Sequence, residues 1–227
     1  MKVKLIWATP DPEQIISDLA RVSAPANQGK APSELLSYCV KNNHWSPFEM
    51  ASACFEIETT RDIARQILRH RSFSFQEFSQ RYAEVGVLPD APYREARMQD
   101  FSNRQNSVPT KDKSILNWWE QQQKFVRVVA EDAYRAALEQ GIAKEVARAV
   151  LPEGLTTSRM YMSGTVRSWM HFCSLRSGNG TQLECQHIAQ AISKEMETLL
   201  PKSWKALMDL DKPAVDLKVP ALLRKSA

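Results

Sequence analysis

Five arginines gather between residues 61 and 81 of this 227-residue chain: Arg61, Arg65, Arg69, Arg71 and Arg81. Guanidinium groups bind phosphate through paired hydrogen bonds, so the cluster could hold an anionic ligand. The first three are spaced by four residues, which on a helix would stack like charges along one face at some energetic cost. Composition alone leaves open the alternative of a solvated helix face paired with acids elsewhere.

Hydroxyl and amide side chains follow the cluster. Between residues 72 and 82 they include Ser72, Ser74, Gln76, Ser79 and Tyr82, with Glu77 among them. Hydroxyls can fill the acceptor positions of a phosphate that arginines leave open. An ionised carboxylate only accepts hydrogen bonds, so Glu77 would suit a ribose hydroxyl or a base N–H. The segment therefore predicts a phosphate site built without glycine.

The stretch RHRSFSFQEFSQRY over residues 69–82 resembles the signature of the flavin-dependent thymidylate synthases, which is Arg-His-Arg, seven residues and a serine. Here the signature is Arg69-His70-Arg71 followed by Ser79. Further stretches stand in the family's order: His44-x-Ser46-x-Phe48-Glu49, Ala147-Arg148-x-x-Leu151-Pro152, then Arg167-Ser168, Phe172, Leu175-Arg176 and Gln182-x-Glu184. They span about residues 44–190, so the chain is identified as a member of that family.

The resemblance implies a reaction and a fold. Such enzymes convert dUMP to dTMP. In that reaction 5,10-methylenetetrahydrofolate supplies the carbon, and NADPH reduces a bound FAD that supplies the hydride. The implied fold is α/β, mixed and non-Rossmann, with a small, mostly antiparallel sheet flanked by helices in one domain over residues 1–227. A homotetramer with active sites at subunit interfaces is also implied.

The resemblance assigns ligands residue by residue. The implied FAD contacts are Ser46, Arg69, His70, Arg71, Glu77, Thr165, Val166, Arg167 and His171. The implied dUMP contacts are Gln66, Ile67, Leu68, Arg69, Glu77, Phe78, Ser79, Gln80, Arg81, Arg148 and Arg176. Departures from the commonest family pattern are Met50 in place of histidine, and Gln76, Thr165 and His171 in place of asparagine.

Arg176 matches the arginine thought to activate the uracil ring. Uracil must become nucleophilic at C5, and a guanidinium beside its N3–C4 edge would stabilise the electron-rich, N3-deprotonated form in a water-poor site. No enzyme nucleophile is then required. Ser79 is therefore interpreted as a dUMP ligand, and the four cysteines are expected to be buried free thiols.

Composition excludes several other classes. The seven glycines form neither GxGxxG nor GxxxxGK[ST], so a Rossmann fingerprint and a Walker A loop are absent. No cysteine pair forms CxxC, and no metal site is expected. A net charge of +4 does not demand nucleic acid, no apolar run approaches a membrane span, and a cytoplasmic location is the expectation. A nucleic-acid module using the same arginines and an inactive structural oligomer are the competing hypotheses.

The elements that must position these residues are predicted to be mostly helices. Alternation of apolar residues predicts strands over 3–7, 51–59 and 155–163. Periodicity predicts helices over 32–42, 61–71, 115–140 and 165–177. Two further helices are predicted from their starts: one begins at Pro12 with Asp11 as its N-cap, and the other begins with a capping box at Thr181. Gly141 is the expected C-cap of the longest helix. Residues 84–114 hold three prolines among polar residues and are expected to form a long mobile loop.

Overall fold

A four-stranded antiparallel sheet lies at the centre of the molecule. The computed structural model describes residues 1–178 and 180–210. The strand order is β1 (Lys2–Ala8), β2 (Ser52–Thr60), β6 (Thr157–Thr165) and β3 (Ser74–Glu77), and each neighbouring pair is antiparallel. This confirms the mixed α/β fold with a small antiparallel sheet. Residues 211–227 of the single expected domain lie outside the described part.

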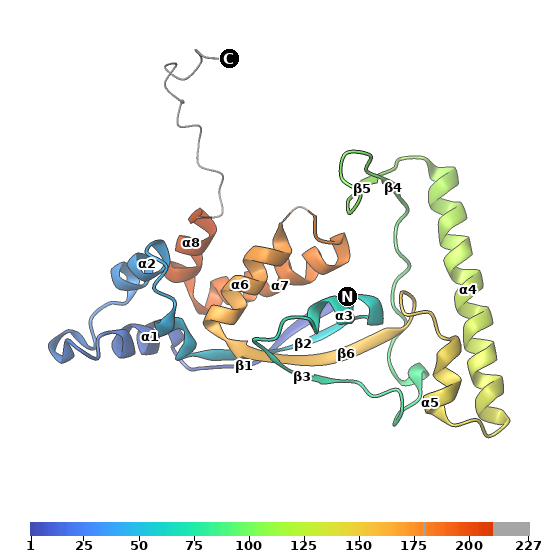
Figure 1. Ribbon diagram of the computed structural model, residues 1–227, viewed down its shortest axis with the longest axis horizontal. Helices are drawn as coiled ribbons and strands as arrows, with labels where there is room; N and C mark the ends of the chain where they lie inside the picture. Colours follow the sequence, from blue (N-terminus) through green and yellow to red (C-terminus); the bar gives the residue numbers. More distant parts are fainter. Residues whose placement is uncertain (179, 211–227) are drawn as a thin grey trace, which may run out of the picture.

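Helices surround this sheet unevenly. The helices are α1 (Pro12–Ala20), α2 (Ser33–Lys41), α3 (Arg61–Ile67), α4 (Lys113–Glu139), α5 (Lys144–Ala147), α6 (Val166–Ser177), α7 (Leu183–Leu199) and α8 (Pro201–Leu210). Short 3-10 turns are η1 (Pro25–Asn27), η2 (Ser46–Glu49), η3 (Val85–Val87) and η4 (Arg148–Val150). Figure 1 shows α6 and α7 against one face of the sheet, with α1, α2 and α8 near one end and the long α4 with α5 beyond the other.

The core lies between the sheet and α6. Alternate residues of β2 point into it, and Ala53, Phe55 and Ile57 are fully buried, as the alternation predicts. Trp169 of α6 packs edge-on against Phe55 and Phe73, with ring centroids 4.9 and 4.6 Å away, and its indole N–H donates to the Ala53 carbonyl at 3.1 Å. This packing fixes the first turn of α6 relative to the strands.

A buried carboxylate joins the two terminal helices. One oxygen of Glu13 accepts hydrogen bonds from the backbone N–H groups of Lys202 and Ser203, at 2.9 and 2.8 Å, and from the Ser203 hydroxyl at 2.8 Å. These amides belong to the first turn of α8 and have no partner within the helix. The negative charge also favours the N-terminal end of the helix dipole. Glu13 therefore holds α8 against α1.

The helix predicted over residues 61–71 is four residues shorter, because α3 ends at Ile67. Its C-terminal turn is closed by hydrogen bonds from the His70 N–H to the Ile67 carbonyl and from the Phe73 N–H to the His70 carbonyl. This turn carries Phe73 into the core. Arg69 consequently leaves the helix, and the predicted stack of three arginines on one helical face is wrong.

Two predicted helix starts also differ. Asp11 precedes α1 with a left-handed φ of 44°, and its side chain makes no capping hydrogen bond. The capping box at Thr181 is wrong because Gln182 is the N-cap of α7. Its fourth member, Glu184, is buried and accepts a hydrogen bond from Arg97 at 2.7 Å instead of capping the helix.

The predicted end of α4 is confirmed. Gly141 adopts a φ of 79°, which only glycine adopts without strain, and its N–H donates to the Leu138 carbonyl at 2.9 Å. The Ile142 N–H donates to the Ala137 carbonyl at 3.0 Å, which completes a Schellman motif. The apolar face predicted along α4 is mostly exposed in the single chain, with Phe125 at 66% and Val129 at 51%.

The segment expected to be a long loop contains structure of its own. Strands β4 (Arg97–Gln99) and β5 (Ser107–Pro109) form a hairpin within it. Arg94 anchors the segment to the end of the sheet by donating to Asp62 at 2.7 Å and to the Thr60 hydroxyl at 2.8 Å. Its mobility stays a prediction.

Substitution of Gly164 in β6 tests the close contact between this strand and the ring of Phe73. A Cβ atom at this position would collide with the ring of Phe73, whose movement is restricted by its contact with Trp169. We expect Gly164→Ala to lower the free energy of unfolding by about 1–3 kcal/mol in urea titrations, through overpacking. Gly86→Ala is the matched control, since nothing lies within 4 Å of its Cβ position. Equal losses in the two variants would contradict this packing.

Candidate active site

Arg176, in the last turn of α6, meets two residues that surround the end of α3. Its Nε donates to Nε2 of His70 at 2.8 Å. Its Nη2 lies 3.5 Å from the backbone carbonyl of Gln66. No residue in the described part of the chain binds the remaining nitrogen, Nη1. The structure therefore brings together three residues that the sequence assigned to one site, and it leaves part of the guanidinium available to a ligand.

His70 is an acceptor for Arg176 because its imidazole is neutral. The ring packs edge-on against Phe172, with centroids 4.9 Å apart. Burial first, and then the charges of Arg176, His171 and Arg69, lower the pKa of His70 to about 4. At neutral pH the imidazole is therefore uncharged, and Nε2 can receive the hydrogen bond.

The arginine cluster divides into paired and unpaired members. Arg65 pairs with Glu153, Arg61 lies 3.7 Å from a Glu77 oxygen, and Arg81 donates to Glu145 at 3.1 Å. For Arg65 and Arg81 the alternative of pairing with acids elsewhere is thus correct, whereas Arg61 lies near an acid of the same segment.

The side chains of three other arginines assigned to the site form no hydrogen bond or ion pair with any described residue: Arg69, Arg71 and Arg148. Arg69 and Arg71 are exposed in the turn after α3, and Arg148 is half-buried at the start of η4. An anionic ligand would not have to displace a carboxylate from any of them.

A shallow groove runs along β3. It is lined by Gln76, Glu77, Phe78, Ser79, Tyr82, Ala83, Arg159 and Tyr161. Glu77 accepts a hydrogen bond from the Ser158 hydroxyl at 2.7 Å, which orients its carboxylate on the strand. The structure therefore places Glu77, Phe78 and Ser79, all assigned to dUMP, on one surface.

Two residues assigned to dUMP have buried side chains. Ile67 is fully buried in the core, so it could meet a ligand only through its backbone. Gln80 is 3% exposed, and its Nε2 has no hydrogen-bond partner in the described part of the chain. An unpaired buried amide is costly, so a partner for Gln80 in the complete site would be stabilising.

A cavity of about 470 Å³ lies beside the start of α6 and holds the second group of expected residues. We call it the α6 cavity. Its lining is Trp45, Glu49, Ser72, Arg167, Ser168, Met170, His171, Ser174 and Leu207. Arg167 and His171, both assigned to FAD, have exposed side chains there. Val166 is different: its side chain is buried in the core.

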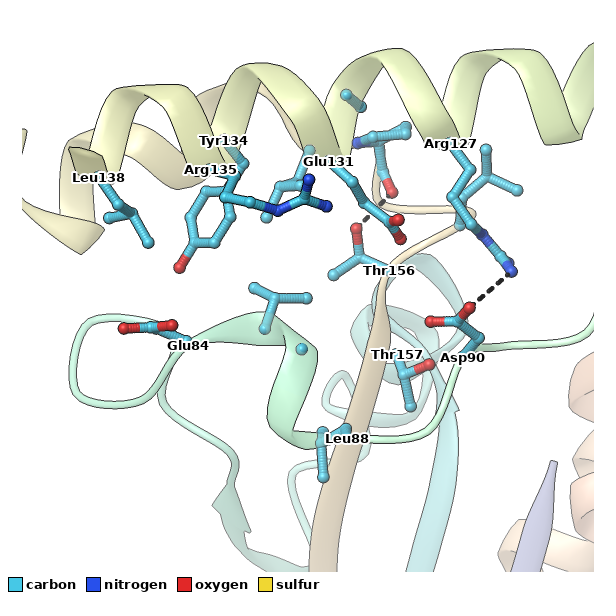
Figure 2. A pocket seen from close by; sticks show the side chains of 16 residues that line it. Glu84, Leu88, Asp90, Arg127, Glu131, Tyr134, Arg135, Leu138, Thr156 and Thr157 are labelled. Carbon is cyan, nitrogen blue, oxygen red and sulfur yellow. Dashed lines mark hydrogen bonds and ion pairs between the residues drawn. The ribbon is translucent and has the colours of Figure 1, made fainter. Parts of the chain in front are cut away.

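Another cavity, of about 210 Å³, lies between α4 and η3 (Figure 2). Arg127, Glu131 and Tyr134 project from α4 toward it, and Arg127 lies 3.5 Å from the Asp90 carboxylate across the gap. Burial, and then the nearby Asp90, raise the pKa of Glu131. No residue that the sequence assigned to the site lines this cavity.

The expected residues thus form separate groups within one chain. Arg176, His70 and Gln66 meet at the end of α3, Arg81 is held by α5, and Arg167 lines the α6 cavity. Figure 1 shows α5 packed near α4, beyond the end of the sheet and away from α6. No described helix could span a membrane, and no described group of three or more His, Cys, Asp or Glu side chains could hold a metal ion. The four thiols are free and buried, as expected.

Fold and site together define an α/β protein with a group of arginine side chains that have no acidic partner in the described part of the chain, and without a glycine-rich phosphate loop. Residues 4–202 match the family model described as thymidylate synthase complementing protein. The chain belongs to that family, whose members include the flavin-dependent thymidylate synthases.

Relatives and solved structures agree with this assignment. The chain is 48% identical over 183 residues to a flavin-dependent thymidylate synthase of Synechocystis sp., covering 81% of this chain and 83% of that protein. It is 47% identical over 197 residues to a probable flavin-dependent thymidylate synthase of Paramecium bursaria Chlorella virus 1, covering 86% and 90%. A crystal structure of the UMP/dUMP methylase PolB from Streptomyces cacaoi bound with 5-Br dUMP superimposes with a TM-score of 0.79 at 31% identity, covering 92% and 94%.

The neutral state of His70 is open to direct measurement. NMR titration of the protein labelled at histidine should give His70 a pKa of about 4, well below the pKa of about 6.5 of a free imidazole. Arg176→Gln should raise this pKa because it removes a neighbouring positive charge. Arg104→Gln, which changes an exposed arginine in the β4–β5 turn, should leave it unchanged. A wild-type midpoint near 6.5 would contradict the burial and contacts described here.

Proposed function

We propose that this chain is a thymidylate synthase that converts dUMP to dTMP with FAD as cofactor. The balanced reaction consumes 5,10-methylenetetrahydrofolate, NADPH and a proton, and it yields tetrahydrofolate and NADP⁺ with dTMP. The observation that carries the proposal is the contact of Arg176 with a neutral His70 and with Gln66. Family membership supports the same reaction.

Arg176 is the proposed catalytic residue. His70 accepts the hydrogen bond from Nε and, being neutral, adds no competing positive charge beside the guanidinium. The free Nη1 edge would face the N3–C4 edge of uracil and stabilise negative charge there, which makes C5 more nucleophilic. Because the guanidinium stays charged at every relevant pH, this effect requires no proton transfer by the protein.

The phosphate of dUMP would be held by Ser79, Gln80, Arg81 and Arg148, with Arg69 and Gln66 nearer the nucleoside. Arg81 must exchange Glu145 for the phosphate. Both partners of that ion pair are more than half exposed, at 68% and 52%, so the exchange is inexpensive. Glu77 would accept hydrogen bonds from the sugar or the flavin, and the remaining assigned positions, Ile67, Leu68 and Phe78, would contribute backbone and apolar contacts.

The side chains around the α6 cavity fit a flavin dinucleotide. Arg167 and His171 supply cationic or polar donors, and Trp45 supplies an aromatic wall. Ser72 also lines the cavity, and the residue before it is Arg71, whose side chain has no acidic partner in the described part of the chain. Ser46, Arg69, His70, Thr165 and Val166 complete the proposed set. Bound FAD supplies the redox chemistry of the reaction, while these residues bind and orient it.

We further propose a cytoplasmic homotetramer with each active site shared between subunits. Support comes from α4, where Trp118, Phe125 and Val129 are 60%, 66% and 51% exposed and would be buried by another copy. Further support comes from the separation of Arg81 from Arg176 within one chain. The free thiols agree with a reducing compartment.

The proposal is tested by dUMP-dependent oxidation of NADPH in the presence of 5,10-methylenetetrahydrofolate, with dTMP detected as product. The purified protein should carry flavin absorption bands that are released on denaturation. A colourless protein that cannot be reconstituted with FAD would refute the proposed function. Steeply salt-dependent binding of polynucleotide by such a protein would favour the nucleic-acid module instead.

The role of Arg176 is tested by substitution. Arg176→Ala should lower turnover at least about a hundredfold, because it removes preorganised charge from the pyrimidine. FAD absorption and affinity should be retained, since Arg176 acts on the substrate. Arg104→Ala serves as the matched control and should turn over like the wild type. Wild-type turnover by Arg176→Ala would refute its assigned role.

A further inference from the structure

Glu49 lines the α6 cavity and stands in a stretch that the family shares, but no ligand contact has been assigned to it. It ends η2, the turn that begins at Ser46. One carboxylate oxygen accepts a hydrogen bond from the Thr165 hydroxyl at 2.7 Å, and the other accepts one from Nη1 of Arg167 at 2.8 Å. Each carboxylate oxygen of Glu49 therefore accepts a hydrogen bond from a residue that is expected to contact FAD.

The hydrogen bonds continue beyond Thr165. Its hydroxyl oxygen accepts the Ser168 N–H at 3.3 Å, which caps α6, and the Ser168 hydroxyl donates to the Ser72 carbonyl at 3.2 Å. Ser72 directly follows Arg69-His70-Arg71. A single chain of hydrogen bonds thus runs from η2 through the start of α6 to the turn after α3, joining the three segments that carry the proposed flavin contacts.

Glu49 is ionised in this arrangement. The hydrogen bond from the Thr165 hydroxyl, together with Arg167, outweighs partial burial and holds the pKa of Glu49 below its usual value. A carboxylate with two charge-assisted partners restricts the rotamers of both, and Arg167 would otherwise be a long, flexible side chain that is 50% exposed.

We propose that Glu49 is a positioning residue of the flavin site, which orients the Arg167 guanidinium at the α6 cavity, holds the start of α6 through Thr165 and places a fixed negative charge in the cavity. The inference rests on the proposed function, because it takes the α6 cavity as the FAD site. Glu49 acts through Arg167 and Thr165 and takes no part in a chemical step.

Glu49→Gln removes the negative charge that orients Arg167 and keeps the size of the side chain. The amide can still accept from Thr165, but its NH₂ group or its uncharged oxygen faces the Arg167 donor, so the guanidinium is released. FAD binding to the full-length protein, measured by fluorescence quenching, should weaken at least about tenfold. Asp18→Asn is the matched control, since Asp18 on α1 also accepts two hydrogen bonds, from Gln14 and Gly29. Asp18→Asn should bind FAD like the wild type.

Two readouts distinguish positioning from a general loss of structure. The midpoint potential of the bound flavin should become more positive in Glu49→Gln, because a nearby negative charge that opposes reduction is removed. Glu49→Asp keeps the charge and should leave the potential near the wild-type value. In a double-mutant cycle, Glu49→Gln should cost less FAD affinity in an Arg167→Met background than in the wild type, because the guanidinium it orients is absent.

The outcomes separate this inference from the proposed function. Unchanged affinity and potential in Glu49→Gln, with wild-type protein that binds FAD and makes dTMP, would overturn the role of Glu49 and leave the proposed function standing. Additive effects of Glu49→Gln and Arg167→Met would also overturn it. A wild-type protein without FAD affinity would refute both. If Glu49→Gln fails to fold, the FAD affinity of Glu49→Asp decides instead. The shorter side chain should weaken FAD binding, and wild-type affinity would overturn the inference.

Discussion

The packing of Trp169 between Phe55 and Phe73 is the constraint on which the rest of the site depends. Phe55 belongs to the central strand β2, and Phe73 ends the turn that carries Arg69, His70 and Arg71. Because Trp169 lies in the first turn of α6, the same contact fixes the start of the helix that follows Thr165 and carries Arg176 in its last turn. One buried aromatic cluster therefore sets the relative position of the proposed cofactor residues and of the arginine proposed to be catalytic.

Net charge conceals how the arginines are used. A formal charge of +4 is small because most acids are matched by bases, as in the pairs Arg65–Glu153 and Arg97–Glu184. What matters is that Arg69, Arg71 and Arg148 have no carboxylate partner in the described part of the chain. Beside them, burial keeps His70 neutral, so the positive potential at Arg176 is concentrated in one guanidinium.

Short-range patterns predicted three strands of the sheet, the ends of most helices and the Gly141 cap, because alternation and φ > 0 are local properties, but they missed the short strand β3. The end of α3 could not be predicted, since Ile67 stops the helix only because Phe73 must reach a core formed by distant strands. The Thr181 box failed for a similar reason: Glu184 pairs with Arg97, far away in sequence. The resemblance supplied the site residues, but only the structure shows that Arg81 and Arg176 lie in different groups, and that Glu49 connects η2 to α6.

Mixing two inactive variants tests most directly whether one active site draws on two subunits. Arg176→Ala and Arg81→Ala, each without turnover alone, are unfolded together and refolded as a mixture. If Arg176 of one subunit serves the same site as Arg81 of another, some sites regain both arginines, and activity should return to about a quarter of the wild-type value. Activity that stays at the level of the separate variants would contradict a shared site and would place both arginines in the same subunit's site.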